Sequence, residues 1–314
     1  MSFCADCKQE LCALAPEKPC CPASELCGLY MTMGSLNLLG RGKVSVQFAN
    51  ENLAVCRRAY TLLSKHMGLS PQLHYVSSNR FGGTRKCVLT LGPMDSPDFL
   101  QAMGMMEKDD EGQWALRSTA PKPRLTRMCC SRAFLRGAML GGGTMSSPET
   151  GYHLELPYSG DEMRLLLAKC LQRLDLPIKY GTRGDRQFCY MKQADQIVTF
   201  LTAIGAHQSV LQIEELRLRK QLLGKVNRAM NCDAFNMGKQ MRASADQVRA
   251  IELLRDKGLL NGLPEALREA AELRLEMPDA TLEQLGQSMR PPVGKSGVNH
   301  RMRRLMQYAE EQTI

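Results

Sequence analysis

The residues with the most evident chemistry lie near the C-terminus, in the stretch TLEQLGQSMRPPVGKSGVNHRMRRLMQYA that begins at Thr281. From residue 290 to residue 309 this stretch has no Asp or Glu and five basic residues: Arg290, Lys295, Arg301, Arg303 and Arg304. Arginine can bind guanine through two hydrogen bonds, asparagine can bind adenine in the same way, and lysine neutralises phosphate. The pattern therefore indicates recognition of double-stranded DNA.

Two short helices with a polar turn between them are predicted to position these residues. Thr281 is followed three residues later by Gln284, which is a capping box that starts a helix. Prolines and Gly294 end this helix, and Ser296 is expected to cap a second one. The apolar residues of the two helices recur at helical spacing and are predicted to be buried: Leu282, Leu285 and Met289, then Val298, Met302, Leu305 and Ala309.

This arrangement is typical of a helix-turn-helix, whose second helix enters the major groove. Three basic residues are predicted to contact phosphate: Lys295, Arg303 and Arg304. Four polar residues are predicted to face the bases: Ser296, Asn299, His300 and Arg301. Thr281 and Gln284, at the start of the first helix, complete the candidate DNA-binding set. The alternative is that the basic face is merely solvated, but the caps, the turn and the segregation of apolar from basic residues favour DNA binding.

The composition is that of a globular, basic protein. The chain has 314 residues, enough for two domains, with 44% hydrophobic and 23% charged residues and a formal net charge of +9. The positive charge favours an anionic partner. No apolar run has the length of a membrane span, and the N-terminus does not resemble a signal peptide, so we expect no membrane partner. Thirteen cysteines in such a chain indicate free thiols in a reduced, cytoplasmic protein.

Two segments of the chain are copies of one pattern, CCPASELCGLYMTMGS from Cys20 and CCSRAFLRGAMLGGGT from Cys129. Vicinal cysteines, a leucine and two glycines fall at equal offsets. Strand-like and helical runs follow both copies in the same order, which predicts two repeats of helix, hairpin, helix, hairpin and helix, at about 1–105 and 129–205. The intervening segment 106–128 is charged and contains proline, and it is interpreted as a linker.

Glycines have a specific task in the leading helix of each repeat. Gly28 and Gly137 would let the two helix backbones approach closely, and Gly34 and Gly143 would end these helices. Two such helices side by side, each leading into a four-stranded sheet, would form a pseudo-twofold saddle.

These segments resemble a known motif. LCGLYMTMG (26–34) and LRGAMLGGG (135–143) look like degenerate copies of the motif that names the LAGLIDADG homing endonucleases. Together with the C-terminal helix-turn-helix, they make nearly the whole chain resemble the WhiA family of bacterial transcription regulators. Further matching segments are GYHLEL, IGAH, VNRAMNCDAFN and KSGVNHRMRRL.

The resemblance implies an α+β protein. A duplicated LAGLIDADG-like domain is expected over 1–218, followed by an all-α domain with a helical connector and the helix-turn-helix over 219–314. The resemblance also implies a sequence-specific, DNA-binding transcription regulator that acts at promoter regions on the nucleoid, in sporulation, cell division or chromosome segregation.

The endonuclease motif carries an aspartate at its penultimate position, and the pair of aspartates holds the catalytic metal. The matching residues here are Met33 and Gly142. Mg²⁺ requires oxygen ligands, which neither residue supplies, and Glu25 and Glu155 do not fall at the matching place. We therefore expect no catalytic residue, no metal and no cofactor. A residual metal-dependent nuclease remains as an alternative.

The cysteines allow two interpretations. If the leading helices pack together, Cys20 and Cys21 could meet Cys129 and Cys130 and form a thiol-based redox or metal sensor. Small buried side chains in a close helix pair are the favoured interpretation. Cys4 and Cys7 have zinc-ligand spacing, but a second spaced pair is lacking, so a zinc site there is disfavoured.

After Gly205 the pattern is helical throughout. A long polar helix over about 226–256 is predicted to act as a connector packed against the helix-turn-helix. An amphipathic helix over 263–276 should complete a three-helix unit. The alternative function is a protein-interaction module, in which these helices contact another transcription factor, a sigma factor, RNA polymerase or a division protein.

Overall fold

The computed structural model of the protein describes residues 2–77, 85–118, 121–123 and 125–312. The chain divides into two compact units, Met1–Leu218 and Arg219–Ile314, which are considered separately below. None of the helices in the described ranges is both long enough and apolar enough to cross a membrane.

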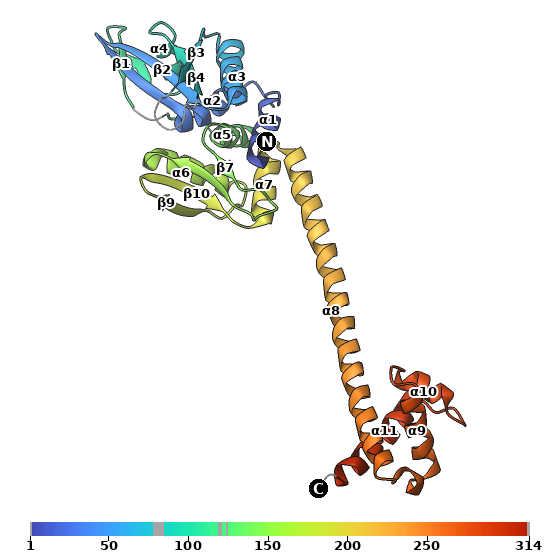
Figure 1. Cartoon of the computed structure of the whole chain (residues 1–314). Coiled ribbons are helices and arrows are strands. Elements are labelled where there is room, and N and C mark those ends of the chain that lie inside the picture. The colour runs from blue at the N-terminus through green and yellow to red at the C-terminus, as the bar shows by residue number, and fades with distance from the viewer. Residues whose placement is uncertain (1, 78–84, 119–120, 124, 313–314) are drawn as a thin grey trace. The chain divides into compact units, whose positions relative to one another are not determined.

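The first repeat of unit 1 is coloured blue to teal in Figure 1. Its four strands form one sheet in the order β1-β2-β4-β3. In chain order its elements are α2 (Cys21–Met33), β1 (Gly34–Gly40), β2 (Lys43–Asn50), α3 (Leu53–Thr61), the π-helical turn η1 (Leu62–His66), β3 (Gln72–Ser77), β4 (Arg85–Leu91) and α4 (Ser96–Ala102).

The second repeat has the same topology, with a sheet in the order β7-β8-β10-β9. Its elements are α5 (Met128–Gly141), β7 (Thr144–Met145), β8 (Leu154–Tyr158), α6 (Gly160–Gln172), β9 (Lys179–Arg183), β10 (Arg186–Met191) and α7 (Ala194–Ile204). The predicted duplication and the order of elements in each repeat are confirmed.

Two features of unit 1 lie outside the predicted pattern. Helix α1 (Phe3–Cys12) precedes the first repeat and buries Cys7 and Leu11 in the shared core. A small hairpin of β5 (Met106–Lys108) and β6 (Trp114–Leu116) lies inside the segment interpreted as a linker. The carboxylate of Asp109 accepts the backbone N–H groups of Glu111 and Gln113 and so closes the hairpin turn.

Helices α2 and α5 pack against each other at backbone distance. A Cβ atom added to Gly28 would lie 2.2 Å from the carbonyl oxygen of Phe134, and one added to Gly137 would lie 2.1 Å from that of Glu25. Real Cβ atoms do not approach so closely, so only glycine fits at both crossing points. The predicted close approach of the two leading helices is confirmed.

A buried ion-pair network joins the repeats beside this crossing. Glu25 of α2 accepts two hydrogen bonds from Arg58 of α3, at 2.7 and 2.9 Å, and one from Arg136 of α5 at 3.3 Å. The Nε of Arg136 also donates to the carbonyl oxygen of Ile204 at the end of α7. The carboxylate is fully paired, as a buried charge must be.

Unit 2 is entirely helical. It contains the C-terminal part of the 50-residue helix α8 (His207–Asp256), which starts in unit 1 after Gly205 ends α7 in the left-handed conformation. The turn η2 (Leu260–Gly262) follows, then α9 (Glu265–Glu276), α10 (Leu282–Ser288) and α11 (Lys295–Glu311). The core gathers residues from all four helices: Ile251, Leu254, Leu267, Ala270, Ala271, Leu285, Met289, Val298, Met302, Leu305 and Ala309. Helix α8 runs through residues 231–236 without a break.

Candidate nucleic-acid interface

The first helix of the pair starts with the predicted capping box. The side-chain oxygen of Thr281 accepts the backbone N–H of Gln284 at 3.2 Å, and the side-chain oxygen of Gln284 accepts the backbone N–H of Thr281 at 2.8 Å. These bonds satisfy two donors that a helix start leaves unpaired. The cap orients α10 so that Leu285 enters the core.

The turn between α10 and α11 lies directly against α10. The N–H of Val293 donates to the carbonyl oxygen of Gly286 at 2.9 Å. A Cβ atom added to Gly286 would lie 2.0 Å from the carbonyl oxygen of Val293, so glycine is required there. The sequence pattern identifies Gly294 as a turn residue, but it gives no comparable signal for Gly286.

Helix α11 begins at Lys295, with Gly294 as its N-cap. Ser296 was expected to cap this helix but lies within its first turn, and its side chain makes no cap hydrogen bond. The N-cap is therefore two residues earlier than predicted, and Ser296 is an exposed residue of the first helical turn.

The two faces of α11 are chemically separate. Val298, Met302, Leu305 and Ala309 are buried, as their spacing predicts. Most of the candidate DNA-binding residues on this helix are exposed, namely Lys295, Ser296, His300, Arg303 and Arg304, and Asn299 is half-buried. The helix therefore presents a polar and basic face that unit 2 does not itself cover.

Arg301 differs from its neighbours because its side chain turns back toward α9. Its Nη1 lies 3.4 Å from a carboxylate oxygen of Glu269 and 3.3 Å from the sulfur of Met289, and its side chain is only 21% exposed. The other oxygen of Glu269 accepts the backbone N–H of Arg290 at 2.7 Å. Glu269 thus holds both the turn and α11.

A signal for this position was present in the sequence. Arg301 precedes the buried Leu305 by four residues and follows the buried Val298 by three, so it lies at the edge of the apolar face. Long arginine side chains lie along such an edge and extend their charged end to a partner on the neighbouring helix.

Arg274 fixes the loop that leads into α10, a role that the sequence analysis missed. Its side chain is almost fully buried and donates to the carbonyl oxygens of Pro278, at 3.2 Å, and Ala280, at 2.6 Å. Burial lowers the pKa of this guanidinium. The hydroxyl of Ser244 on α8 donates to the same oxygen of Pro278. A charged residue on the apolar face of the predicted helix 263–276 was the available signal.

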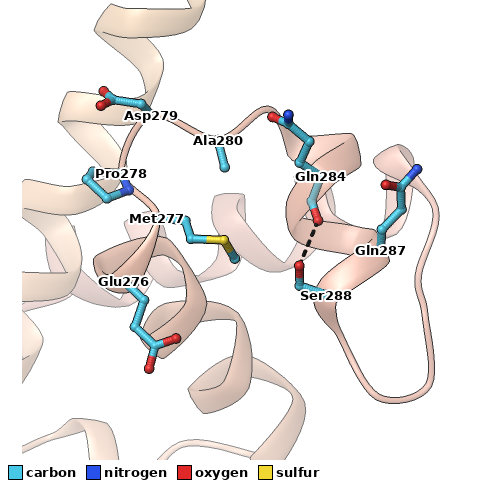
Figure 2. A pocket seen from close by; sticks show the side chains of 8 residues that line it. All are labelled: Glu276, Met277, Pro278, Asp279, Ala280, Gln284, Gln287 and Ser288. Carbon is cyan, nitrogen blue, oxygen red and sulfur yellow. Dashed lines mark hydrogen bonds between the residues drawn. The ribbon is translucent and has the colours of Figure 1, made fainter.

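Figure 2 shows a hollow at the corner between α9 and α10. It carries the carboxylates of Glu276 and Asp279, and its lining includes no Lys or Arg. Phosphate has no favourable charge there, so we place the candidate interface on α11 instead. The lining residues are Glu276, Met277, Pro278, Asp279, Ala280, Gln284, Gln287 and Ser288.

The two positions that match the nuclease aspartates lie at the C-terminal ends of α2 and α5. The sulfur of Met33 accepts a hydrogen bond from the side-chain amide of Asn50 at 3.4 Å. At Gly142 an added Cβ atom would lie 2.7 Å from Cγ of Pro157 and 3.2 Å from Cβ of Thr32. The second position therefore lacks room for a carboxylate side chain, in addition to lacking the carboxylate.

Glu25 and Glu155, the acidic residues that do not match the metal-binding positions of the endonuclease motif, pair with basic side chains. Glu25 lies in the buried network with Arg58 and Arg136. Glu155 of β8 pairs with Arg183 at 2.8 Å and with the ring of His153 at 2.7 Å.

The opposite, N-terminal ends of α2 and α5 bring thiols together. The sulfurs of Cys20 and Cys129 are 3.8 Å apart, and those of Cys20, Cys21 and Cys129 all lie within 4.8 Å of one another. The thiol of Cys130 contacts the carbonyl oxygen of Cys20 at 3.9 Å. Hydrogen bonding from Cys130 is the first of several contacts that lower the pKa of Cys20.

Cys4 and Cys7 do not converge in this way. The thiol of Cys4 points to the carbonyl oxygen of Gly143, and Cys7 is buried in the core. Among the residues that the structure describes, the cluster at Cys20 is the only group of three or more Cys, His, Asp or Glu side chains close enough to share a metal ion.

Three domain descriptions match successive parts of the chain. They are the WhiA N-terminal LAGLIDADG-like domain over residues 19–106, the WhiA LAGLIDADG-like domain over 131–222 and the WhiA C-terminal HTH domain over 226–309. Together they cover most of the sequence and both units of the structure.

Whole-length relatives agree with this result. The chain is 40% identical to the "Probable cell division protein WhiA" of Symbiobacterium thermophilum, over 99% of this chain and 98% of that one. It is 38% identical to the protein of the same name from Heliobacterium modesticaldum, over 99% and 96%. Among solved structures, full-length DUF199/WhiA from Thermatoga maritima matches with a TM-score of 0.62 and 25% identity, over 99% of both chains.

Proposed function

Because the chain belongs to the WhiA family, and because α11 exposes a polar, basic face, we propose that it is a sequence-specific DNA-binding regulator of transcription. The exposed face of α11 carries this proposal. It joins a helix-turn-helix geometry to the charge and the donor groups that DNA requires. The names of its relatives support a role in cell division. Sporulation, chromosome segregation and a place on the nucleoid rest on the family resemblance stated above.

The roles within the interface follow from exposure. Lys295, Arg303 and Arg304 neutralise phosphates, because their charged ends are solvent-exposed. Ser296, Asn299 and His300 face the base edges from the first two turns of α11, the part of a recognition helix that enters the groove. Arg301 can contact a base only if it leaves Glu269. The loss of that ion pair then reduces the free energy gained from the base contact. Gln284 uses its oxygen in the capping box and keeps its amide nitrogen for the DNA backbone beside Thr281.

Salt dependence on duplex DNA tests the proposal. Promoter fragments found by genome-wide mapping of bound sites would be titrated at several salt concentrations, with the intact protein and with Arg303→Ala and Arg304→Ala. Each substitution should reduce the slope of log K against log salt by about one unit, because one fewer counterion is released. Arg255→Ala, at the exposed end of α8, serves as the matched control. Equal slopes for all variants would contradict the assignment.

The LAGLIDADG-like unit does not act as a nuclease in this proposal. Met33 lacks an oxygen ligand, and Pro157 occupies the space beside Gly142. Supercoiled plasmid incubated with the protein and Mg²⁺ or Mn²⁺ should remain intact. Metal-dependent cleavage by the purified protein would contradict this part of the proposal.

A second function, contact with another protein, is favoured by one observation on α8. Between residues 222 and 241 this helix exposes large apolar side chains: Leu222, Leu223, Val226, Met230, Phe235, Met237 and Met241. By helical geometry all of these except Phe235 lie on one side of α8, and such a row of apolar side chains is typical of a protein-binding surface. A sigma factor, RNA polymerase, another transcription factor or a division protein would be the partner. Salt-insensitive DNA binding together with partner capture lost in Met230→Lys would favour this function over the first.

A further inference from the structure

The N-terminal ends of α2 and α5 place three thiols where one metal ion could bind all of them. We propose that Cys20, Cys21 and Cys129 bind a Zn²⁺ ion that links the two repeats of unit 1. Cys130 adds a fourth thiol next to this group. The proposal concerns unit 1 and does not depend on DNA binding by α11.

The distances agree with zinc coordination. Zinc–thiolate bonds are about 2.3 Å long, so two sulfurs in a tetrahedral site are separated by roughly 3.8 Å. The sulfurs of Cys20 and Cys129 are 3.8 Å apart, and all three sulfurs lie within 4.8 Å of one another. A shift of at most about 1 Å would bring the third sulfur to the same spacing.

Adjacent cysteines ordinarily point apart, but here each pair lies at a helix start. Cys20 is the N-cap residue of α2, and Cys21 is its first helical residue. The backbone of Cys20 is itself in the right-handed helical region, and the sulfurs of both residues lie within 4.8 Å of the sulfur of Cys129. Cys129, one residue into α5, reaches that point from the other repeat.

The electrostatic surroundings favour a thiolate at Cys20, whereas burial opposes one at Cys21 and raises the pKa of that thiol to about 12. The N-terminal ends of two helices converge on the cluster, and each contributes a positive partial charge. The guanidinium of Arg127 lies 3.9 Å from the sulfur of Cys20. Binding of Zn²⁺ would release the thiol protons to solvent and leave bound thiolates.

The cluster is accessible on one side. Cys20 is half-buried, whereas Cys21 and Cys129 are buried, so an ion can enter past Cys20 and be held from within. The cluster lies at the opposite end of the helix pair from Met33 and Gly142. The metal would therefore stabilise the junction between the repeats, with no part in phosphodiester chemistry.

Metal uptake by the intact protein tests this inference. Reduced, metal-free protein would be titrated with Co²⁺, a spectroscopic substitute for Zn²⁺, and the stoichiometry would be checked by native mass spectrometry with Zn²⁺. We expect one ion per chain, a thiolate-to-cobalt charge-transfer band, displacement of Co²⁺ by Zn²⁺, and a higher melting temperature for the zinc-loaded protein.

Variants identify the ligands. Cys20→Ser and Cys129→Ser should each weaken Co²⁺ binding at least tenfold, while Cys232→Ser, an exposed cysteine in unit 2, should leave it unchanged. Circular dichroism shows whether each variant folds. Alkylation of the protein without substitutions gives a test that does not depend on how the variants fold. Zn²⁺ should protect Cys20 from alkylation, whereas Cys232 should remain reactive.

Three results would overturn the proposal. The first is the absence of stoichiometric metal uptake by the reduced protein. The second is binding that Cys20→Ser and Cys129→Ser leave intact. The third is recovery of a Cys20–Cys129 disulfide in a protein that takes up no metal after reduction, which would make the cluster a redox site.

Discussion

The carboxylate of Glu25 and the guanidinium of Arg136 form an ion pair between the two repeats, with 3.3 Å between Oε2 and Nη1. The side chain of Glu25 is 0% exposed and that of Arg136 is 8% exposed. Each charge depends on the other, because the carboxylate has no contact with water and the guanidinium has very little. The pair lies beside the crossing of Gly28 and Gly137, so charge pairing and close backbone packing fix the same junction.

Removal of one member of this pair should destabilise unit 1 strongly. Glu25→Ala leaves Arg58 and Arg136 buried without their counter-ion, and we expect a loss of about 3–5 kcal/mol in the free energy of unfolding. Urea denaturation followed by circular dichroism measures it. Glu51→Ala is the control, because its pair with Lys86 is exposed and should contribute at most about 1 kcal/mol. Equal losses for both variants would show that the buried network is not stabilising.

The glycine crossing gives a second prediction. Gly137→Ala places a methyl group 2.1 Å from the carbonyl oxygen of Glu25 and must push α2 and α5 apart. We expect a loss of about 1–3 kcal/mol, the usual range for an overpacked core. Thermal unfolding measures this loss. Gly92→Ala is the matched control, since an added Cβ there meets no atom within 4 Å. A melting temperature for Gly137→Ala no lower than that of the control would contradict this packing.

Buried thiols predict a loss of stability in alkali. Burial raises the pKa of Cys7 and of Cys189 from 9.0 to about 12. Between these pH values the unfolded chain loses the thiol protons that the folded chain keeps, so stability is complete below pH 9 and falls as the pH rises toward 12. Urea titrations from pH 8 to pH 11 should show this fall. Cys189→Ala should show a shallower fall, and an unchanged slope in that variant would exclude Cys189 as a contributor.

Much of the fold could be predicted because the chain repeats its own pattern. Cysteines and glycines at equal offsets indicated two copies of one unit, and the identical strand orders confirm them. The β5–β6 hairpin was hidden because its two strands have only three residues each. Such short strands lack the alternation that distinguishes a strand from a charged loop. Helix α1 buries only two residues fully, and its pattern was correspondingly weak.

The candidate interface was predictable at the level of helices and less so at the level of side chains. Spacing identified the buried face of α11, because burial follows the 3.6-residue period. The partner of Arg301 depends on where α9 packs, and local spacing carries no information about that. The same holds for Arg274, whose acceptors lie in the loop that it fixes. The meeting of Cys20 with Cys129 followed from the duplication, but its distance required the packed helix pair.

The contact between Glu269 and Arg301 leads to a prediction that separates two roles for this arginine. If Arg301 reads a base, Glu269 competes with the DNA for it, and Glu269→Gln should strengthen binding to the promoter sequence. Arg301→Ala should then relax base preference by about 1–3 kcal/mol. If Arg301 only braces α11, both substitutions should lower the melting temperature of unit 2 without changing sequence preference. Binding to matched and mismatched promoter fragments, measured with the melting curves, distinguishes the two.

Substitution of Lys295 should change the stability of unit 2 and its DNA binding in opposite directions. It is the first residue of α11, where the positive end of the helix dipole disfavours a cation, and that turn has no acidic residue. Lys295→Glu should therefore raise the stability of unit 2 by about 0.3–1 kcal/mol. It should also weaken DNA binding, because a phosphate contact is replaced by like-charge repulsion. Lys295→Gln, which only removes the charge, should reduce the salt slope by about one unit. Urea denaturation and salt-dependent fluorescence anisotropy measure the two effects. A Lys295→Glu variant that is less stable yet binds DNA normally would refute both the position of the helix start and the phosphate contact.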